Sequence, residues 1–127
     1  MKREMKFRAK AINDDFFKGE WVYGYYTKEL WSGNLLDVIT DGANDIPIQI
    51  ETLGQFTGLC DKDGKEIYEG DILLMGEDDG CMIYNEVGIK DGCFGYIGEV
   101  NGELIPFCHF NVKEEIAGNI YDNSNLI

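Results

Sequence analysis

The sequence predicts a mainly β fold of short antiparallel strands with little helix. Short runs rich in aromatic and β-branched residues recur along the chain, and this composition is typical of strands. Sixteen of the 127 residues are glycine, and Asp-Gly and Asn-Gly pairs separate several of the runs, as tight turns between strands require. No long segment has the spacing of apolar residues that a helix needs. At this length we expect one compact domain over residues 1–127.

The first expected strand covers residues 5–12, in which cations and apolar residues alternate. Lys6, Arg8 and Lys10 share one parity, and Phe7 and Ala9 share the other. Because a strand places alternate side chains on opposite faces, we expect an edge strand with a cationic outer face and an apolar inner face. Further strands are expected at residues 21–26, 35–40, 46–50, 56–59, 66–68, 72–75, 81–87, 93–97 and 104–110.

The second half of the chain is expected to form an SH3-like small barrel. Glu69, Gly70 and Asp71 form a turn that enters an apolar strand, and residues 76–80 follow it as an acidic loop. Glycine supplies the open backbone geometry of such a turn, and aspartate bonds locally within it. We therefore expect an N-terminal β arm or insert region over residues 1–53 and a barrel-like region over residues 54–127. Whether residues 13–50 pack onto the barrel or stand apart is left open.

The charge of the chain is unevenly distributed. It has 24 acidic residues against 11 Lys and Arg, for a net charge of -13. Residues 1–10 hold five of those cations and one of the acids, which leaves +4 there and -17 on the rest. An acidic body argues against a direct nucleic-acid binder and against attraction to an anionic membrane. Without an apolar run of membrane-spanning length or a signal-peptide pattern, we expect a cytoplasmic protein.

No residue pattern predicts a catalytic, metal or cofactor site. The four cysteines, at positions 60, 81, 93 and 108, include no close pair of the kind that zinc sites use, so we expect reduced, mostly buried thiols. His109 is expected to be structural or to lie at the surface. The acids of residues 61–66 depart from the calcium-loop order and are expected to form a turn. We expect no cofactor, no metal and no enzymatic activity.

Two further groups of residues are candidates for interactions. Trp21, Tyr23 and Tyr25 are expected to share a strand face and to pack in the core or at a subunit interface. A base-stacking platform is the alternative, but the segment is flanked only by Lys18 and Lys28. The acids Glu77, Asp78 and Asp79 are expected in a solvated loop, with a basic partner or a hard cation as alternatives. With the cations of the first strand, the candidate interaction residues are Lys6, Arg8, Lys10, Trp21, Tyr23, Tyr25, Glu77, Asp78 and Asp79.

Three blocks of the sequence carry a resemblance to a known family. They are residues 3–9, the long motif of residues 54–72, and residues 116–123 with the sequence Ile-Ala-Gly-Asn-Ile-Tyr-Asp-Asn. In this order they resemble the YopX-like family, whose members are encoded largely by phages and prophages. Cys60 stands where lysine is more usual, and residues 13–50 match none of these blocks. The resemblance implies a β-rich fold and a mobile-element origin, but no catalytic residue and no established activity.

Two functions follow as hypotheses. The first is a non-enzymatic binding and assembly protein, a homo-oligomer joined through its basic N-terminal strand and the acidic body of a second copy. The second is an acidic decoy that imitates nucleic acid and occupies a host DNA- or RNA-binding protein. An enzyme is the third and weakest reading, and a cleft that holds two carboxyl groups with a raised pKa would favour it.

Overall fold

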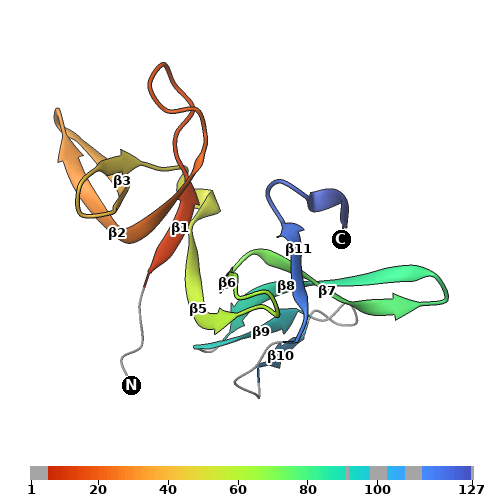
Figure 1. Ribbon diagram of the computed structural model, residues 1–127. Helices are drawn as coiled ribbons and strands as arrows, with labels where there is room; N and C mark the ends of the chain where they lie inside the picture. The colour runs from red at the N-terminus through yellow and green to blue at the C-terminus, as the bar shows by residue number, and fades with distance from the viewer. Residues whose placement is uncertain (1–5, 91, 98–102, 108–112, 127) are drawn as a thin grey trace. The chain divides into compact units, whose positions relative to one another are not determined.

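The computed structural model describes residues 6–90, 92–97, 103–107 and 113–126 (Figure 1). The chain divides into two compact units, Met1–Phe56 and Thr57–Ile127. The division falls close to the boundary expected at residue 53, and the single compact domain stays a prediction. The described elements are antiparallel strands and two single-turn 3-10 helices, so the expectation of a mainly β, antiparallel fold with little helix is confirmed.

The first unit is an antiparallel sheet with the strand order β4-β3-β2-β1-β5. Its core is formed by Ala9, Ile39 and Ile48, against which Phe7, Val22, Tyr26 and Leu53 pack. The elements are β1 (Phe7–Lys10), β2 (Trp21–Trp31), β3 (Asn34–Thr40), β4 (Asp45–Pro47), η1 (Ile50–Thr52) and the beginning of β5 (Gly54–Cys60).

The expectation of an N-terminal edge strand is wrong. β1 pairs with β2 on one side, with Arg8 opposite Tyr23, and with β5 on the other, with Arg8 opposite Gly54. Alternating charge predicts the two faces of a strand but contains no information about its neighbours in the sheet. With both edges of Phe7 and Arg8 paired, this part of β1 has no free edge to which a further strand could add.

The second unit contains a five-stranded antiparallel sheet with the order β10-β9-β8-β7-β11. Ile67, Leu73 and Val87 form its buried core. Its strands are β7 (Asp71–Asp78), β8 (Cys81–Lys90), β9 (Cys93–Ile97), β10 (Leu104–Pro106) and β11 (Glu115–Asn119). The unit also contains β6 (Glu66–Tyr68), which pairs with β5, and the 3-10 helix η2 (Ser124–Leu126). Because β10 and β11 end this sheet, the described strands close no barrel, and the SH3-like barrel is not confirmed.

Several elements differ from their expected positions. β4 ends at Pro47 rather than at residue 50, where the chain turns into η1, and β11 was not expected. Residues 76–78 continue β7, so the expected acidic loop is instead the end of a hairpin. Asp91, the Asn101-Gly102 pair, Cys108 and His109 lie outside the described residues.

The cysteines of the described chain are not buried as expected. Cys60, Cys81 and Cys93 lie in β5, β8 and β9 and are exposed free thiols. Each occurs near the end of a strand, where alternating positions face solvent. Among the described residues, no helix has the length and hydrophobicity to cross a membrane.

Candidate functional site

β1 places its cations together on one side of the first sheet. Phe7 and Ala9 pack into the core, and Ala9 is completely buried. Side chains alternate along a strand, so Lys6, Arg8 and Lys10 project from the opposite side. The cations and the apolar residues therefore lie on opposite sides of this segment, but Arg8 is only 7% exposed, so the expected cationic outer face is wrong for Arg8.

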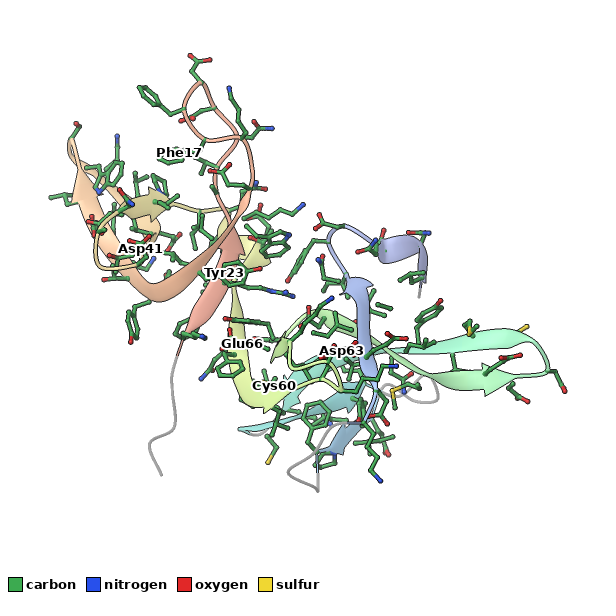
Figure 2. All side chains as sticks on the ribbon, viewed as in Figure 1. Phe17, Tyr23, Asp41, Cys60, Asp63 and Glu66 are labelled. Atoms are coloured by element: carbon green, nitrogen blue, oxygen red, sulfur yellow. The ribbon has the colours of Figure 1, made fainter. Side chains whose placement is uncertain are left out.

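β2 adds three aromatic rings to the same side. Tyr23 is paired with Arg8, and Trp21 with Lys10, and paired residues of an antiparallel ladder project from the same face. The intervening Val22 packs against the core, which confirms that Trp21, Tyr23 and Tyr25 share a face. Tyr23 (Figure 2) is 50% exposed and Tyr25 is 61% exposed. The expectation that these two tyrosines pack in the core of the chain is therefore wrong, because the core lies on the other side of β2.

The cations and the rings are in direct contact. The guanidinium carbon of Arg8 lies 4.7 Å from the centroid of the Trp21 ring, and Lys10 Nζ lies 5.6 Å from it. Lys6 Nζ lies 5.1 Å from the centroid of Phe56 on β5. Such contacts contribute about 0.5–1 kcal/mol at exposed sites and hold the cations against the sheet. We call Lys6, Arg8, Lys10, Trp21, Tyr23, Tyr25 and Phe56 the cation–aromatic face, in which Arg8 and Phe56 are each only 7% exposed.

The two lysines that flank the aromatic run in sequence are engaged elsewhere. Lys28 Nζ forms an ion pair with Asp37 at 3.3 Å, and Lys18 Nζ donates to the backbone carbonyls of Asp14 and Asp15. Asp37 also accepts a hydrogen bond of 2.5 Å from the Tyr26 hydroxyl. That bond, with the nearby charge of Lys28, lowers the pKa of Asp37. The cations of the face thus come from β1 and from Lys6, the residue before it. Phe56 is a member that could not be predicted from the sequence, because only the sheet pairing reveals it.

The three acidic candidates lie at the end of the β7–β8 hairpin in the second unit. Glu77 and Asp78 belong to β7 and pair with Met82 and Cys81, and Asp79 begins the turn. Asp79 and Gly80 have φ values of +50° and +82°, and a type I′ turn requires positive φ at both central residues. All three acids are exposed. They belong to the second unit, whereas the other six predicted candidates belong to the first.

The long motif that carries the family resemblance has a structural role in the second unit. Asp61, which is 6% exposed, accepts hydrogen bonds from the backbone N–H groups of Asp63, Lys65 and Ile116 at 2.9–3.0 Å. Burial alone would raise the pKa of Asp61, but these hydrogen bonds outweigh burial and lower it. The predicted turn is therefore confirmed. Asp61 connects this turn to β11.

The C-terminal block packs onto the same motif. Ile120 N–H donates to the Gly70 carbonyl at 2.9 Å, and a Cβ at Gly70 would lie 3.2 Å from Cε2 of Tyr121. Gly70 has a φ of +92°, which disfavours any residue with a side chain. The Asn119 side chain in turn accepts from the N–H groups of Tyr121 and Asp122. The most recognisable blocks of the sequence therefore hold the second unit together.

Burial also raises the pKa of two other titratable groups in the second unit. Burial, with a contribution from Glu69, raises the pKa of Glu86 above its ordinary value, and Gly70 N–H donates to the Val87 carbonyl beside it. Burial and the neighbouring Glu114, which accepts from the Tyr96 hydroxyl at 3.1 Å, raise the pKa of Tyr96 to about 12. Within the described part of the chain, no group of three or more His, Cys, Asp or Glu side chains is placed to hold a metal ion. The absence of enzymatic activity stays a prediction.

The chain is similar to known proteins both in sequence and in fold. A family model described as YopX protein matches residues 6–127. The chain belongs to the YopX family. The match includes residues 13–50, so this segment is part of the family's shared length rather than an insert peculiar to this chain. No curated protein matches the sequence.

A solved structure supports the fold of this YopX protein along its length. The crystal structure of protein EF1440 from Enterococcus faecalis is similar, with a TM-score of 0.58 and 23% identity. The similarity covers 98% of this chain and 99% of that one. At this identity the likeness concerns the fold alone.

Proposed function

We propose that this YopX protein is a non-enzymatic binding and assembly protein that forms homo-oligomers through its cation–aromatic face. The observation that carries the proposal is the alignment of Lys6, Arg8 and Lys10 over aromatic rings in a chain whose residues 11–127 total -17. Every further copy of the chain presents a large acidic surface to such a face. Charge complementarity of this kind directs association and fixes its register.

The manner of assembly differs from the addition of an edge strand. β1 is paired with β2 and β5, so the association uses the side chains of the face rather than backbone hydrogen bonds. Tyr23 and Tyr25 supply exposed aromatic area, and tyrosine is enriched at protein interfaces because its ring is large and its tip is polar. The expected role of the aromatic run at a subunit interface is thus retained in the proposal.

Substitution of surface lysines tests this proposal better than deletion of residues 1–10, because deletion would remove a central strand. In light scattering coupled to size exclusion, the wild-type chain is expected to exceed the monomer mass. The variant Lys6→Glu/Lys10→Glu is expected to run as a monomer with an unchanged circular dichroism spectrum. The control Lys90→Glu/Lys113→Glu makes the same change of net charge at exposed lysines of the second unit and is expected to keep the oligomer.

A second variant removes the rings without changing the charge. Tyr23→Ser/Tyr25→Ser is expected to reduce the oligomer mass as well, because both rings are exposed on the face. A wild-type chain that is monomeric at every concentration contradicts the proposal, as does a folded Lys6→Glu/Lys10→Glu variant that retains the wild-type mass.

The acidic decoy is the alternative function, and it makes a different prediction. A decoy uses free, arrayed carboxylates, and its binding to a host DNA- or RNA-binding protein should collapse at about 0.5 M salt, where the screening length is a few Å. Several acids of this chain instead hold their own turns, as Asp14 and Asp41 do, which favours assembly. A mobile-element origin and a cytoplasmic location are part of both proposals, and the exposed free thiols fit a reducing compartment.

A further inference from the structure

We propose that Asp79 and Gly80, at the end of the β7–β8 hairpin, form a modification site at which the folded chain isomerises spontaneously to isoaspartate. Water is the only co-reactant, and the inference does not depend on the proposed self-association. It rests on a difference among three Asp-Gly pairs of the described chain, which are Asp41-Gly42, Asp63-Gly64 and Asp79-Gly80.

The reaction joins a carboxyl group to the amide nitrogen of the next residue. The Gly80 nitrogen attacks Cγ of Asp79, an N–Cγ bond forms, a C–O bond of the carboxyl breaks, and water leaves with the amide proton. A second water molecule then opens the succinimide ring. Its addition at Cγ restores aspartate. Its addition at the main-chain carbonyl carbon breaks the bond from that carbon to the Gly80 nitrogen, and the chain then continues through Cβ and Cγ. Glycine favours the attack because no side chain shields its nitrogen.

Hydrogen bonds hold both reacting groups of the first pair. Gly42 N–H donates to Thr40 Oγ1 at 3.2 Å. The Asp41 carboxylate accepts from the N–H groups of Ala43 and Asn44 at 2.9 and 2.7 Å. The bonds from Asn44 and Ala43 lower the pKa of Asp41, so the protonated carboxyl that loses water is less abundant. The fold therefore slows isomerisation at this pair.

The backbone of the second pair is also held. Gly64 N–H donates to the Asp61 carbonyl at 3.0 Å. The Asp61 carboxylate binds the N–H groups of Asp63 and Lys65 at 2.9 Å, on either side of this glycine. A neutral hydrogen bond that must break first slows a reaction about fivefold. The Gly64 nitrogen is therefore hindered in reaching its aspartate.

Neither reacting group of the third pair is held in this way. Among the described residues, none accepts a hydrogen bond from Gly80 N–H and none donates one to the Asp79 carboxylate. Both residues are exposed. An added Cβ would meet no atom within 4 Å at Gly42, Gly64 or Gly80, so access to the nitrogen is similar in all three pairs. Hydrogen bonding therefore separates Asp79-Gly80 from the other two.

The modification changes the end of the hairpin. Asp79 and Gly80 form a two-residue turn between Asp78 and Cys81, which are paired in the ladder. Such turns require particular backbone geometries, and isoaspartate adds one methylene group to the main chain of the turn. We therefore expect the pairing next to the turn to loosen in the isomerised chain.

Incubation of the folded wild-type chain in water labelled with heavy oxygen tests the inference. Each passage through the succinimide places one labelled oxygen in the chain, whichever carbonyl carbon the water attacks. After digestion in ordinary water, mass spectrometry with fragmentation assigns the label to single residues. Asp79 should gain label about fivefold or more faster than Asp41 and Asp63, and its peptide should give a second chromatographic peak for isoaspartate.

Two controls separate the fold from the sequence. Asp79→Glu should abolish labelling at this position, because the corresponding ring has six members and forms far more slowly. Unfolding the chain in denaturant should bring the three rates together, because each pair has the same two residues. Asp91 and Asn101 lie outside the described residues, so the comparison omits their peptides. Equal labelling of the three aspartates in the folded chain would overturn the inference, as would the absence of label at Asp79.

Discussion

In the second unit, Asp61 and Asp71 point inward and bind backbone N–H groups of their own unit, whereas in the first unit Lys6 and Lys10 lie over aromatic rings on a sheet face. Both sets of charged residues are ordered, but only the lysines of the first unit present their charge on the side of a sheet away from its core. The difference indicates that the family's longest motif maintains the fold. The candidate for function lies in shorter, less distinctive segments.

Removal of the Asp61 carboxylate is the largest expected disturbance. Asp61→Ala leaves three backbone N–H groups without their acceptor and should lower the free energy of unfolding by about 3 kcal/mol. The lowered pKa of Asp61 means that its contribution is present at neutral pH and is lost as pH falls through that pKa, so the two proteins should converge in acid. Urea unfolding measures both effects. Asp63→Ala, an exposed acid of the same turn, is the control, and an equal loss there would contradict the role of Asp61.

The contact between Gly70 and the C-terminal block predicts a smaller loss. Gly70→Ala combines an unfavourable φ of +92° with a Cβ only 3.2 Å from Tyr121, and we expect a loss of about 2 kcal/mol. Gly64 has a similar φ of +84° but no atom within 4 Å of the added Cβ. Gly64→Ala should therefore cost only the backbone strain. Thermal melts of the two variants that coincide would show that Tyr121 does not restrict this position.

Among the described acids of the second unit, Glu86 is the one whose pKa is raised by burial, and this burial is expected to weaken the fold. Its raised pKa stabilises the fold at low pH, and that stabilisation is lost as pH rises through the raised value. Glu86→Gln should therefore increase the free energy of unfolding near pH 7 and have little effect near pH 4. Unfolding curves at both pH values test the sign. A variant that is less stable near pH 7 would show that the carboxylate is favourably bound.

The smallest effect on stability is expected at the face itself. Tyr25→Ser removes a ring that is 61% exposed, so unfolding of the dilute protein should change by less than about 0.5 kcal/mol. The same substitution should still weaken association, since the ring lies on the proposed interface. A large loss of stability in the dilute monomer would instead make Tyr25 a residue that supports the fold.

Local pattern was enough to predict some of these features. β6 (Glu66–Tyr68) and β9 (Cys93–Ile97) lie where expected, because both are short runs of strand-forming residues next to turns. β11 was missed because Glu115–Asn119 contains a glycine and an alanine and no alternation, and one of its N–H groups binds the distant Asp61. The face was predicted as two separate groups, a cationic strand and an aromatic strand. Their contact depends on sheet pairing, and neither charge nor periodicity specifies which strands become neighbours.

The most direct test of the account is hydroxyl-radical footprinting of the full chain as its concentration is raised. Oxidation of Tyr23 and Tyr25 is expected to fall in parallel with the increase in mass. Phe16, which is 89% exposed and lies outside the face, should react at a constant rate. The Lys6→Glu/Lys10→Glu variant should show no protection at either tyrosine. Oxidation of Tyr23 and Tyr25 that does not change while the protein assembles would contradict the claim that this face is the interface.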